Sequence, residues 1–375
     1  MSRITVCFAL AAGLAAAVSC TGLQGGPDRV PGGAVSRSDV AGILASLPLG
    51  SEHLDEVYEA VSSSSGNGYD EDYMMSDLFG APGRGVGDPQ TKAPHPYSTP
   101  LRDLFVEYLG SRPTKAAGLD AEGFINAVTE SGMQIYWPYS EDWDGKSFPV
   151  ITFDPGDGSK SNVGYEISFD SEGERVLTEV VVDEEMAMRR PVWVINTNDD
   201  SLLTPVCKAA SSQTKAGSSG TQLILKNFTM LRNFDSWFGG ASEFLIKCGA
   251  VDGFKATKDE DLKLYTPSVT DFMIVVKRKQ LGLQIPLDAV LLTDLTDQME
   301  TVAFMIVEDD GGTTTSWKCE ASVKYNSKSY GFELNIPYKD KDDIVWRGQL
   351  STSYFDRYLP TVGRFGDVKV SFTLR

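Results

Sequence analysis

Carboxylates that follow expected β-strands are the residues of this sequence best placed to do chemistry. An apolar stretch, 302–307, has the composition of a central strand, and two alternating stretches follow it at 317–325 and 328–337. An up-down-up order of three strands brings the ends of the first and the third to one edge. The acidic residues just after those two ends are Asp309, Asp310, Asp340, Asp342 and Asp343. Calcium prefers six to eight oxygen ligands, so this edge is a candidate calcium site. Ordinary solvated turns are the simpler interpretation, because Asp is favoured in turns.

A second group combines aromatic rings with carboxylates. Its members are Trp137, Tyr139, Asp142, Trp143 and Asp144. Aromatic faces beside hydrogen-bonding groups suit a sugar, since rings bury area at little entropic cost. The same aromatics could simply be core residues. An EF-hand beginning here is not expected, because Ser140 and Ile151 stand where the first and the last carboxylate ligands are required.

Signatures of other catalytic chemistry are scarce. His53 and His95 are the only histidines, and both are expected at the surface. The motifs HExxH and GxSxG are absent, and no glycine-rich nucleotide fingerprint follows an expected strand. Two carboxylates can still hydrolyse a glycoside. An exported hydrolase is therefore the competing hypothesis, with acids drawn from Asp142, Asp144, Asp154, Asp183, Glu184 and Glu185.

The first twenty residues have the pattern of an export signal. Arg3 is followed by an apolar run, 4–18, and small residues precede Cys20. Cys20 stands where a bacterial lipoprotein carries its lipid, whereas Ala17 and Ser19 also suit the general signal peptidase. Both interpretations cut the chain before Cys20 and predict export. We expect lipid on Cys20 and attachment to the cell envelope at the outer membrane.

Composition narrows the class of partner. The 375 residues include 52 acidic and 34 basic side chains, for a net charge of -18, which repels nucleic acid. Cations, basic partners or neutral glycans are compatible with such a surface, and solubility alone also explains it. Hydrophobic residues make up 41% of the chain, which is enough for folded cores. Cys207, Cys248 and Cys319 lack CxxC spacing, so one disulfide with a free thiol and three separate thiols both stay open.

The element pattern changes along the chain. Helices are expected in 38–131, with Ser38, Ser51, Thr99 and Asp120 as N-caps. Short β-rich runs follow at 134–137, 148–153, 164–169, 176–182 and 191–196, and after residue 221 the pattern is nearly all β. These features predict an α+β domain followed by an all-β antiparallel sandwich. The expected divisions are a signal at 1–19, a tether at 20–36, the α+β domain at 37–207, a linker at 208–220 and the sandwich at 221–375.

Two resemblances accompany this pattern. Residues 69–73 (YDEDY), 136–139 (YWPY) and 190–196 (RPVWVIN) resemble uncharacterised predicted lipoproteins of gut-type Gram-negative bacteria. That resemblance implies no particular activity. The last 150 or so residues resemble a C2-like β-sandwich in strand pattern and in the placement of acidic loops, which implies calcium-dependent or protein-protein binding. The leading expectation is therefore a non-enzymatic envelope lipoprotein that binds a glycan, a peptide or a protein.

Overall fold

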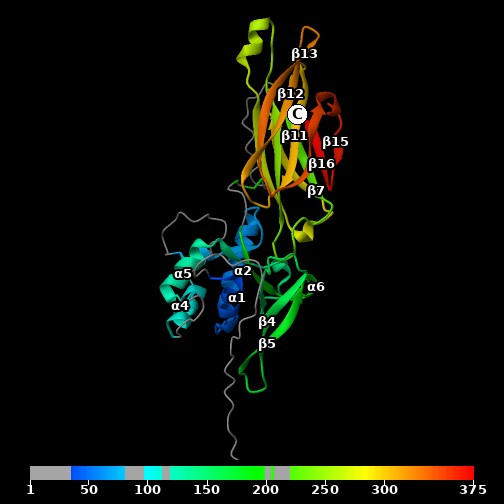
Figure 1. The fold of residues 1–375 in the computed structure, drawn as a ribbon. Coiled ribbons are helices and arrows are strands. Elements are labelled where there is room, and N and C mark those ends of the chain that lie inside the picture. Colours follow the sequence, from blue (N-terminus) through cyan, green and yellow to red (C-terminus); the bar gives the residue numbers. More distant parts are fainter. Residues whose placement is uncertain (1–34, 81–96, 112–118, 199–202, 204, 207–219) are drawn as a thin grey trace, which may run out of the picture.

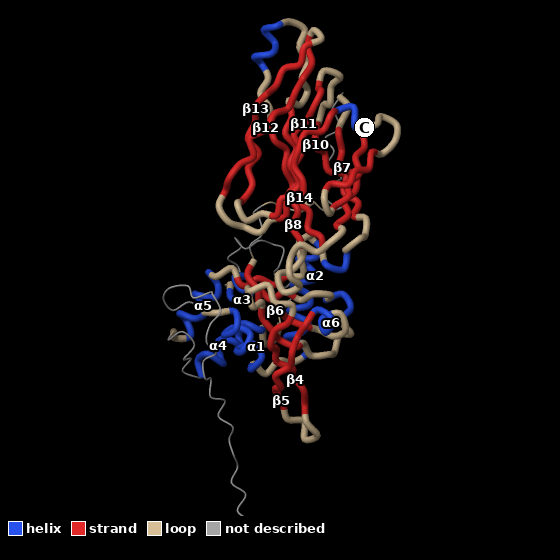
Figure 2. Tube along the Cα trace, turned by 45° about the vertical axis from the view of Figure 1, so that its right-hand side comes forward, coloured by secondary structure: helices blue, strands red, loops and turns tan. Residues whose placement is uncertain are grey.

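An α+β part and a β-sandwich lie end to end in the computed structural model, as predicted (Figures 1 and 2). The structure describes residues 35–80, 97–111, 119–198, 203, 205–206 and 220–375. Helices and a mixed sheet form one end of the elongated molecule, and the sandwich forms the other. None of the helices within these ranges is long and apolar enough to cross a membrane.

Six helices of the α+β part lie within the described ranges. They are α1 (Arg37–Ser46), α2 (Ser51–Gly66), α3 (Met75–Phe79), α4 (Leu101–Ser111), α5 (Ala121–Glu130) and α6 (Glu184–Ala187). Asp120 caps α5 as predicted, because its carboxylate accepts a hydrogen bond from the Gly123 amide at 2.8 Å. The predicted caps of the first two helices were wrong by one or two residues. Ser36 caps α1, and Gly50 is the N-cap of α2.

A six-stranded sheet completes this part. Its strands are β1 (Asp72–Met74), β2 (Met133–Tyr136), β3 (Val150–Phe153), β4 (Ser161–Phe169), β5 (Arg175–Asp183) and β6 (Val192–Thr197), in the order β1-β2-β6-β3-β4-β5. Only the β3–β6 pair among them is parallel. Helix α1 packs on β3 and β6, and Trp137 and Trp193 are fully buried in the core between helices and sheet.

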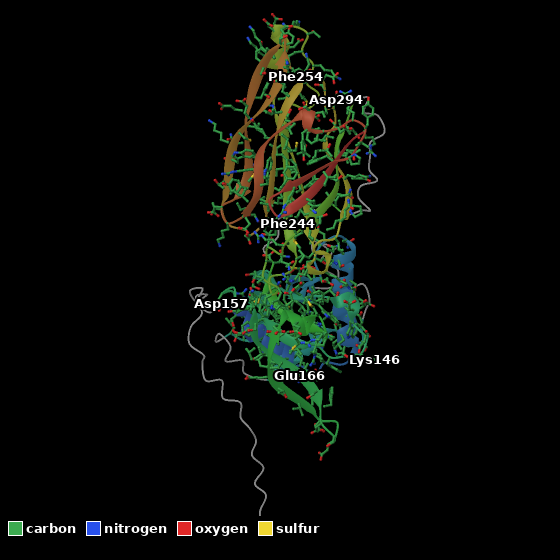
Figure 3. All side chains as sticks on the ribbon, turned by 90° about the vertical axis from the view of Figure 1, so that its right-hand side faces the viewer. Lys146, Asp157, Glu166, Phe244, Phe254 and Asp294 are labelled. Atoms are coloured by element: carbon green, nitrogen blue, oxygen red, sulfur yellow. The ribbon has the colours of Figure 1, made fainter. Side chains whose placement is uncertain are left out.

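The sandwich consists of a smaller and a larger sheet. The smaller one has the order β10-β7-β16-β15, from β7 (Leu223–Met230), β10 (Ile285–Leu292), β15 (Thr361–Phe365) and β16 (Val368–Leu374). The larger has the order β13-β12-β11-β8-β9, from β8 (Ser242–Ala250), β9 (Ser268–Val276), β11 (Met299–Glu308), β12 (Thr314–Tyr325) and β13 (Lys328–Lys339). A further strand, β14 (Asp343–Ser351), also pairs with β11. Phe244 lies at the end of the sandwich nearer the α+β part and Phe254 at the far end (Figure 3).

The hairpin of β12 and β13 has the turn and the buried faces that the sequence predicts. Asn326 and Ser327 form the two-residue turn between β12 and β13, with φ of 48° and 62°. Two successive positive φ angles define a type I′ hairpin turn, whose twist matches that of the paired strands. The predicted apolar faces of both strands are the buried or half-buried ones. The predicted hairpin is therefore confirmed.

A loop between β7 and β8, residues 231–241, joins the two parts and is here called the docking loop. Trp237 and Phe238 in it pack against Tyr136, Val182 and Val194 of the α+β sheet. The Trp237 indole N–H donates to the Lys160 carbonyl at 2.9 Å, and Asn196 donates to the carbonyls of Phe238 and Gly239 at 3.1 and 2.7 Å. Apolar packing and hydrogen bonds thus hold the two parts together, in an interface that no sequence pattern predicted.

The chain meets the sandwich ahead of the expected linker. Pro205 pairs in parallel with Met273 of β9, and the Val206 amide donates to the Met273 carbonyl at 2.8 Å. Residues 207–219, which include most of the expected linker and Cys207, lie outside the described residues. Cys248 and Cys319 are free thiols, the first of them fully buried.

The predicted surface position of His53 was wrong. His53 is only 5% exposed, and its Nδ1 accepts a hydrogen bond from the Gly50 amide at 2.9 Å. The ring thus supplies a side-chain acceptor to the start of α2, where Gly50 has none of its own. His95 lies outside the described residues.

Candidate functional site

The aromatic and acidic residues singled out in the sequence line one hollow of about 140 Å³ on the α+β part. Trp137, Tyr139, Asp142, Trp143 and Asp144 all contribute to it. At about 30 Å³ per water molecule, the hollow has room for on the order of four or five waters. That space suits a single ring or end group of a larger ligand.

The base of the hollow is an aromatic cluster. Trp137 is 1% exposed, and its ring centroid lies 5.2 Å from that of Trp143 and 5.7 Å from that of Trp193. The rings meet edge to face, which is a favoured geometry for aromatic pairs. The core interpretation therefore holds for Trp137, whereas Tyr139 and Trp143 stay partly exposed. A hydrogen bond also orients the Trp143 ring, because its indole N–H donates to the Ser147 carbonyl at 3.0 Å.

Tyr139 lies in the turn that follows β2, at the side of the hollow. Its backbone is left-handed, with φ of 60°, which is uncommon for a residue other than glycine. Its hydroxyl donates to Glu184 at 3.1 Å, and Glu184 also accepts from Arg278 of the sandwich at 2.6 Å. Burial and the Glu184 carboxylate raise the pKa of Tyr139 to about 12. Tyr139 is therefore a neutral hydroxyl at physiological pH, held in place from both parts of the molecule.

The two aspartates of the hollow have defined structural partners. Asp144 accepts from the amides of Ser147 and Lys146 at 2.7 and 2.9 Å, and from the Ser147 hydroxyl at 2.7 Å. These hydrogen bonds, with the Ser147 amide first among them, lower the pKa of Asp144 to about 2. Asp142 forms an ion pair with Lys279 at 2.9 Å. Both carboxylates therefore act as hydrogen-bond acceptors that also order the rim.

The opposite wall comes from residues 187–191, between α6 and β6. Met188 is 56% exposed, and Arg189 and Arg190 stand beside it. Sequence reasoning missed this wall, because it lies beside Trp137 and Trp143 through the pairing of β6 with β2 and β3, which are distant in the sequence. A methionine next to two arginines at the end of a short helix was the local signal available.

The five aspartates of the sandwich do meet at one end, as the strand-order argument predicts. The Asp310 amide donates to Asp342 at 3.3 Å, and Glu308 is in register with Asp343. Asp309 forms an ion pair with Lys339 at 2.7 Å, Asp342 also accepts from the Lys339 amide at 2.8 Å, and Asp340 caps the Thr313 amide at 2.8 Å. Turn stabilisation thus accounts for much of this geometry, and calcium at these five residues stays a prediction.

The acids of the hydrolase hypothesis are distributed over separate structural roles. Asp154 pairs with Arg37 at 2.6 Å, Asp183 caps α6 through the Met186 amide at 2.9 Å, and Glu184 binds Arg278. A glycosidase acid needs a raised pKa, and Asp144 at the hollow has a lowered one. Asp144 is therefore unsuited to the role of the general acid.

The fold therefore consists of an α+β part that carries the candidate site and a β-sandwich that packs against it. No family model matches the chain, and no curated protein matches it.

Proposed function

We propose that this chain is an exported, lipid-anchored protein of the cell envelope that binds a neutral glycan at the aromatic hollow. The carrying observation is that five residues selected from the sequence for sugar-binding chemistry line one hollow. Sugars present C–H faces that pack on rings and hydroxyls that bond to carboxylates and guanidinium groups.

The charge of the hollow supports a neutral ligand. Asp142 and Asp144 contribute two negative charges, and Arg189 and Arg190 on the opposite wall contribute two positive ones. Their formal charges cancel, although the whole chain carries -18. Three of these groups already have ion-pair partners, since Asp142 pairs with Lys279, Arg189 with Glu185 and Arg190 with Glu166. A neutral ligand with many hydroxyls can use the donors and acceptors of both walls without competing for these charges.

Binding should weaken about tenfold when Trp143 is replaced by alanine, since a tenfold change corresponds to about 1.4 kcal/mol and an aromatic contact contributes that order of energy. Met188→Ala on the opposite wall should have a smaller effect in the same direction. A glycan array followed by calorimetric titration of the best oligosaccharide would measure both. Tyr358→Ala is the matched control, because Tyr358 is 92% exposed and outside the hollow. Equal affinity of all three variants and the wild type for the sugar would refute the site. Turnover of the sugar by the purified protein would show that the protein is a hydrolase and not a binding protein.

Anchoring rests on the first twenty residues, which lie outside the described part of the chain. Labelling of expressing bacteria with a radioactive fatty acid should mark the wild-type protein and spare Cys20→Ala. This result is expected because the lipid is attached through the cysteine itself. The same label on both proteins would contradict the proposal of a lipid anchor without affecting the proposed hollow.

A further inference from the structure

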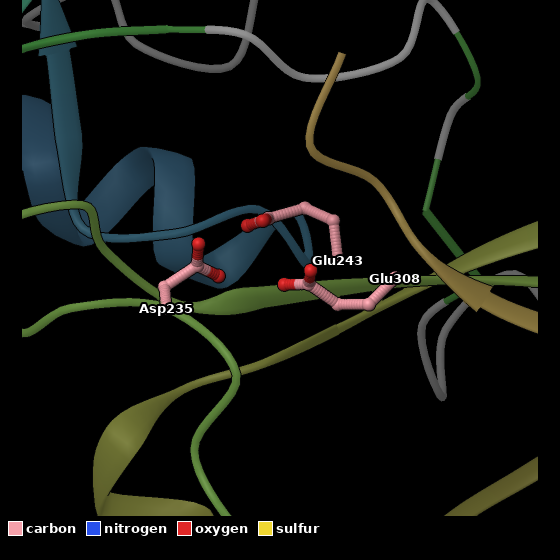
Figure 4. A group of neighbouring side chains, drawn as sticks. All are labelled: Asp235, Glu243 and Glu308. Carbon is pink, nitrogen blue, oxygen red and sulfur yellow. The ribbon is translucent and has the colours of Figure 1, made fainter. Parts of the chain in front are cut away.

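Three carboxylates converge beside the docking loop, away from the aromatic hollow (Figure 4). Asp235 belongs to the docking loop, Glu243 to the start of β8 and Glu308 to the end of β11. One oxygen from each lies within 4.8 Å of the others. We call this group the interface acid cluster.

Two of the three carboxylates are buried, and Asp235 is half-buried. Glu308 is 1% exposed and Glu243 is 7% exposed. Neither carboxylate oxygen of Glu308 receives a hydrogen bond from any residue that the structure describes, although both point toward Asp235 and Glu243. A buried carboxylate with no donor is unfavourable unless a proton or a cation neutralises it. Burial first, and the Asp235 carboxylate second, raise the pKa of Glu308, which reports the same unfavourable charge.

A cavity of about 130 Å³ adjoins the cluster, because Asp235 and Glu243 of the cluster also line the cavity. The cavity lies between the two parts of the protein, since its other walls include Asp70 and Asn196 of the α+β part. Asp70 and Asn196 are 4% and 1% exposed, and the Oδ1 atom of each receives no hydrogen bond within the described ranges. The space therefore offers oxygen acceptors that call for a positively charged or donating occupant.

We propose that the interface acid cluster binds a divalent cation of the calcium class, which links the docking loop to strands β8 and β11. Calcium binds oxygens at about 2.3–2.6 Å, so two oxygens on opposite sides of one ion lie up to about 5 Å apart. The spread of 4.8 Å in the cluster fits that limit. The three side chains supply only oxygen ligands, which suits calcium rather than a metal that prefers nitrogen or sulfur. Water molecules in the adjoining cavity can complete the coordination.

The position of the cluster gives the ion a structural role. Trp237, Phe238 and Ala241 of the same docking loop contact the α+β part, and the Ala241 amide donates to Asp70 at 2.7 Å. An ion that holds Asp235 against Glu243 and Glu308 would order this loop. It would thereby stabilise the docking of the two parts, independently of any ligand in the hollow.

Titration of the EDTA-treated full chain with calcium chloride tests the proposal. We expect heat of binding in calorimetry and a melting temperature that rises by several degrees in millimolar calcium, with a smaller rise in magnesium. Glu243→Gln with Glu308→Gln should weaken calcium binding at least tenfold and remove the rise. The double variant should fold in EDTA, since each amide keeps the shape of the acid and removes a buried charge. Asp235→Asn, in the loop itself, is the single variant that tests the same site with the least change to the sandwich core.

Asp309→Asn with Asp342→Asn is the control, because these residues lie at the same end of the sandwich but outside the cluster. This control should keep both the heat and the rise. Loss of calcium binding in the control, with retention in the Glu243 and Glu308 variant, would move the ion to the turn aspartates and overturn the proposal. An unchanged melting temperature of the wild type in calcium, magnesium, manganese and EDTA would mean that protons alone neutralise the cluster.

Discussion

Replacing Trp237 by alanine should undock the two parts of the protein, with a loss of about 3–5 kcal/mol, the usual cost of removing a large buried aromatic side chain. Trp237 is 3% exposed, although it belongs to the sandwich part, and it is buried by residues of the α+β sheet. The truncation also leaves the Lys160 carbonyl without its indole donor. Denaturant unfolding should change from one transition to two, since each part keeps its own core.

Tyr358→Ala provides the reference for that experiment, because an exposed ring should change the unfolding free energy by less than about 0.5 kcal/mol. Near-ultraviolet circular dichroism would check that both cores of the Trp237 variant remain packed. A single transition at unchanged denaturant concentration would show that Trp237 contributes little to docking, and that polar contacts such as those of Asn196 are sufficient.

Arg278→Met should lower stability by about 2–4 kcal/mol, because it leaves Glu184 and the Asp235 carbonyl without a charged donor. The Arg278 side chain is 8% exposed, and its partner Glu184 is 29% exposed, so water compensates only in part. Glu184 also orients Tyr139, so the same change should weaken ligand binding at the hollow. Denaturant unfolding and calorimetric titration measure the two effects on one sample.

A double-mutant cycle with Glu184→Gln separates the ion pair from lost packing. The loss of unfolding free energy in the double variant should be smaller than the sum of the losses in the two single variants. With both residues replaced, no buried charge is left without its partner. Additive losses would show that Arg278 acts through its aliphatic stem and the Asp235 carbonyl. The exposed pair of Lys318 and Glu333 in the sandwich, at 3.6 Å, is a matched control for which almost no loss is expected.

Local physics explains what the sequence determined by itself. Alternation with period two placed Leu334 and Ile336 in the core, and Asn326 and Ser327 supplied the left-handed residues that a tight hairpin needs. The cap at Asp120 is equally local, because donor and acceptor are three residues apart. The predicted strand order returns the chain to the end of the sheet where Asp310 lies, and the pairing of β14 with β11, which the sequence did not predict, then places Asp342 beside Asp310.

Tertiary packing decided everything that depends on distant segments. His53 is only 5% exposed although polar residues flank it in the sequence, because its burial depends on what packs over α2. Arg278 and Glu184 are 94 positions apart, and the wall at Met188 lies beside Trp143 through the pairing of β6 with both β2 and β3. The interface acid cluster combines a loop and the ends of two strands. Sequence periodicity reports which face of an element is buried, but it carries no information about which other element will cover that face.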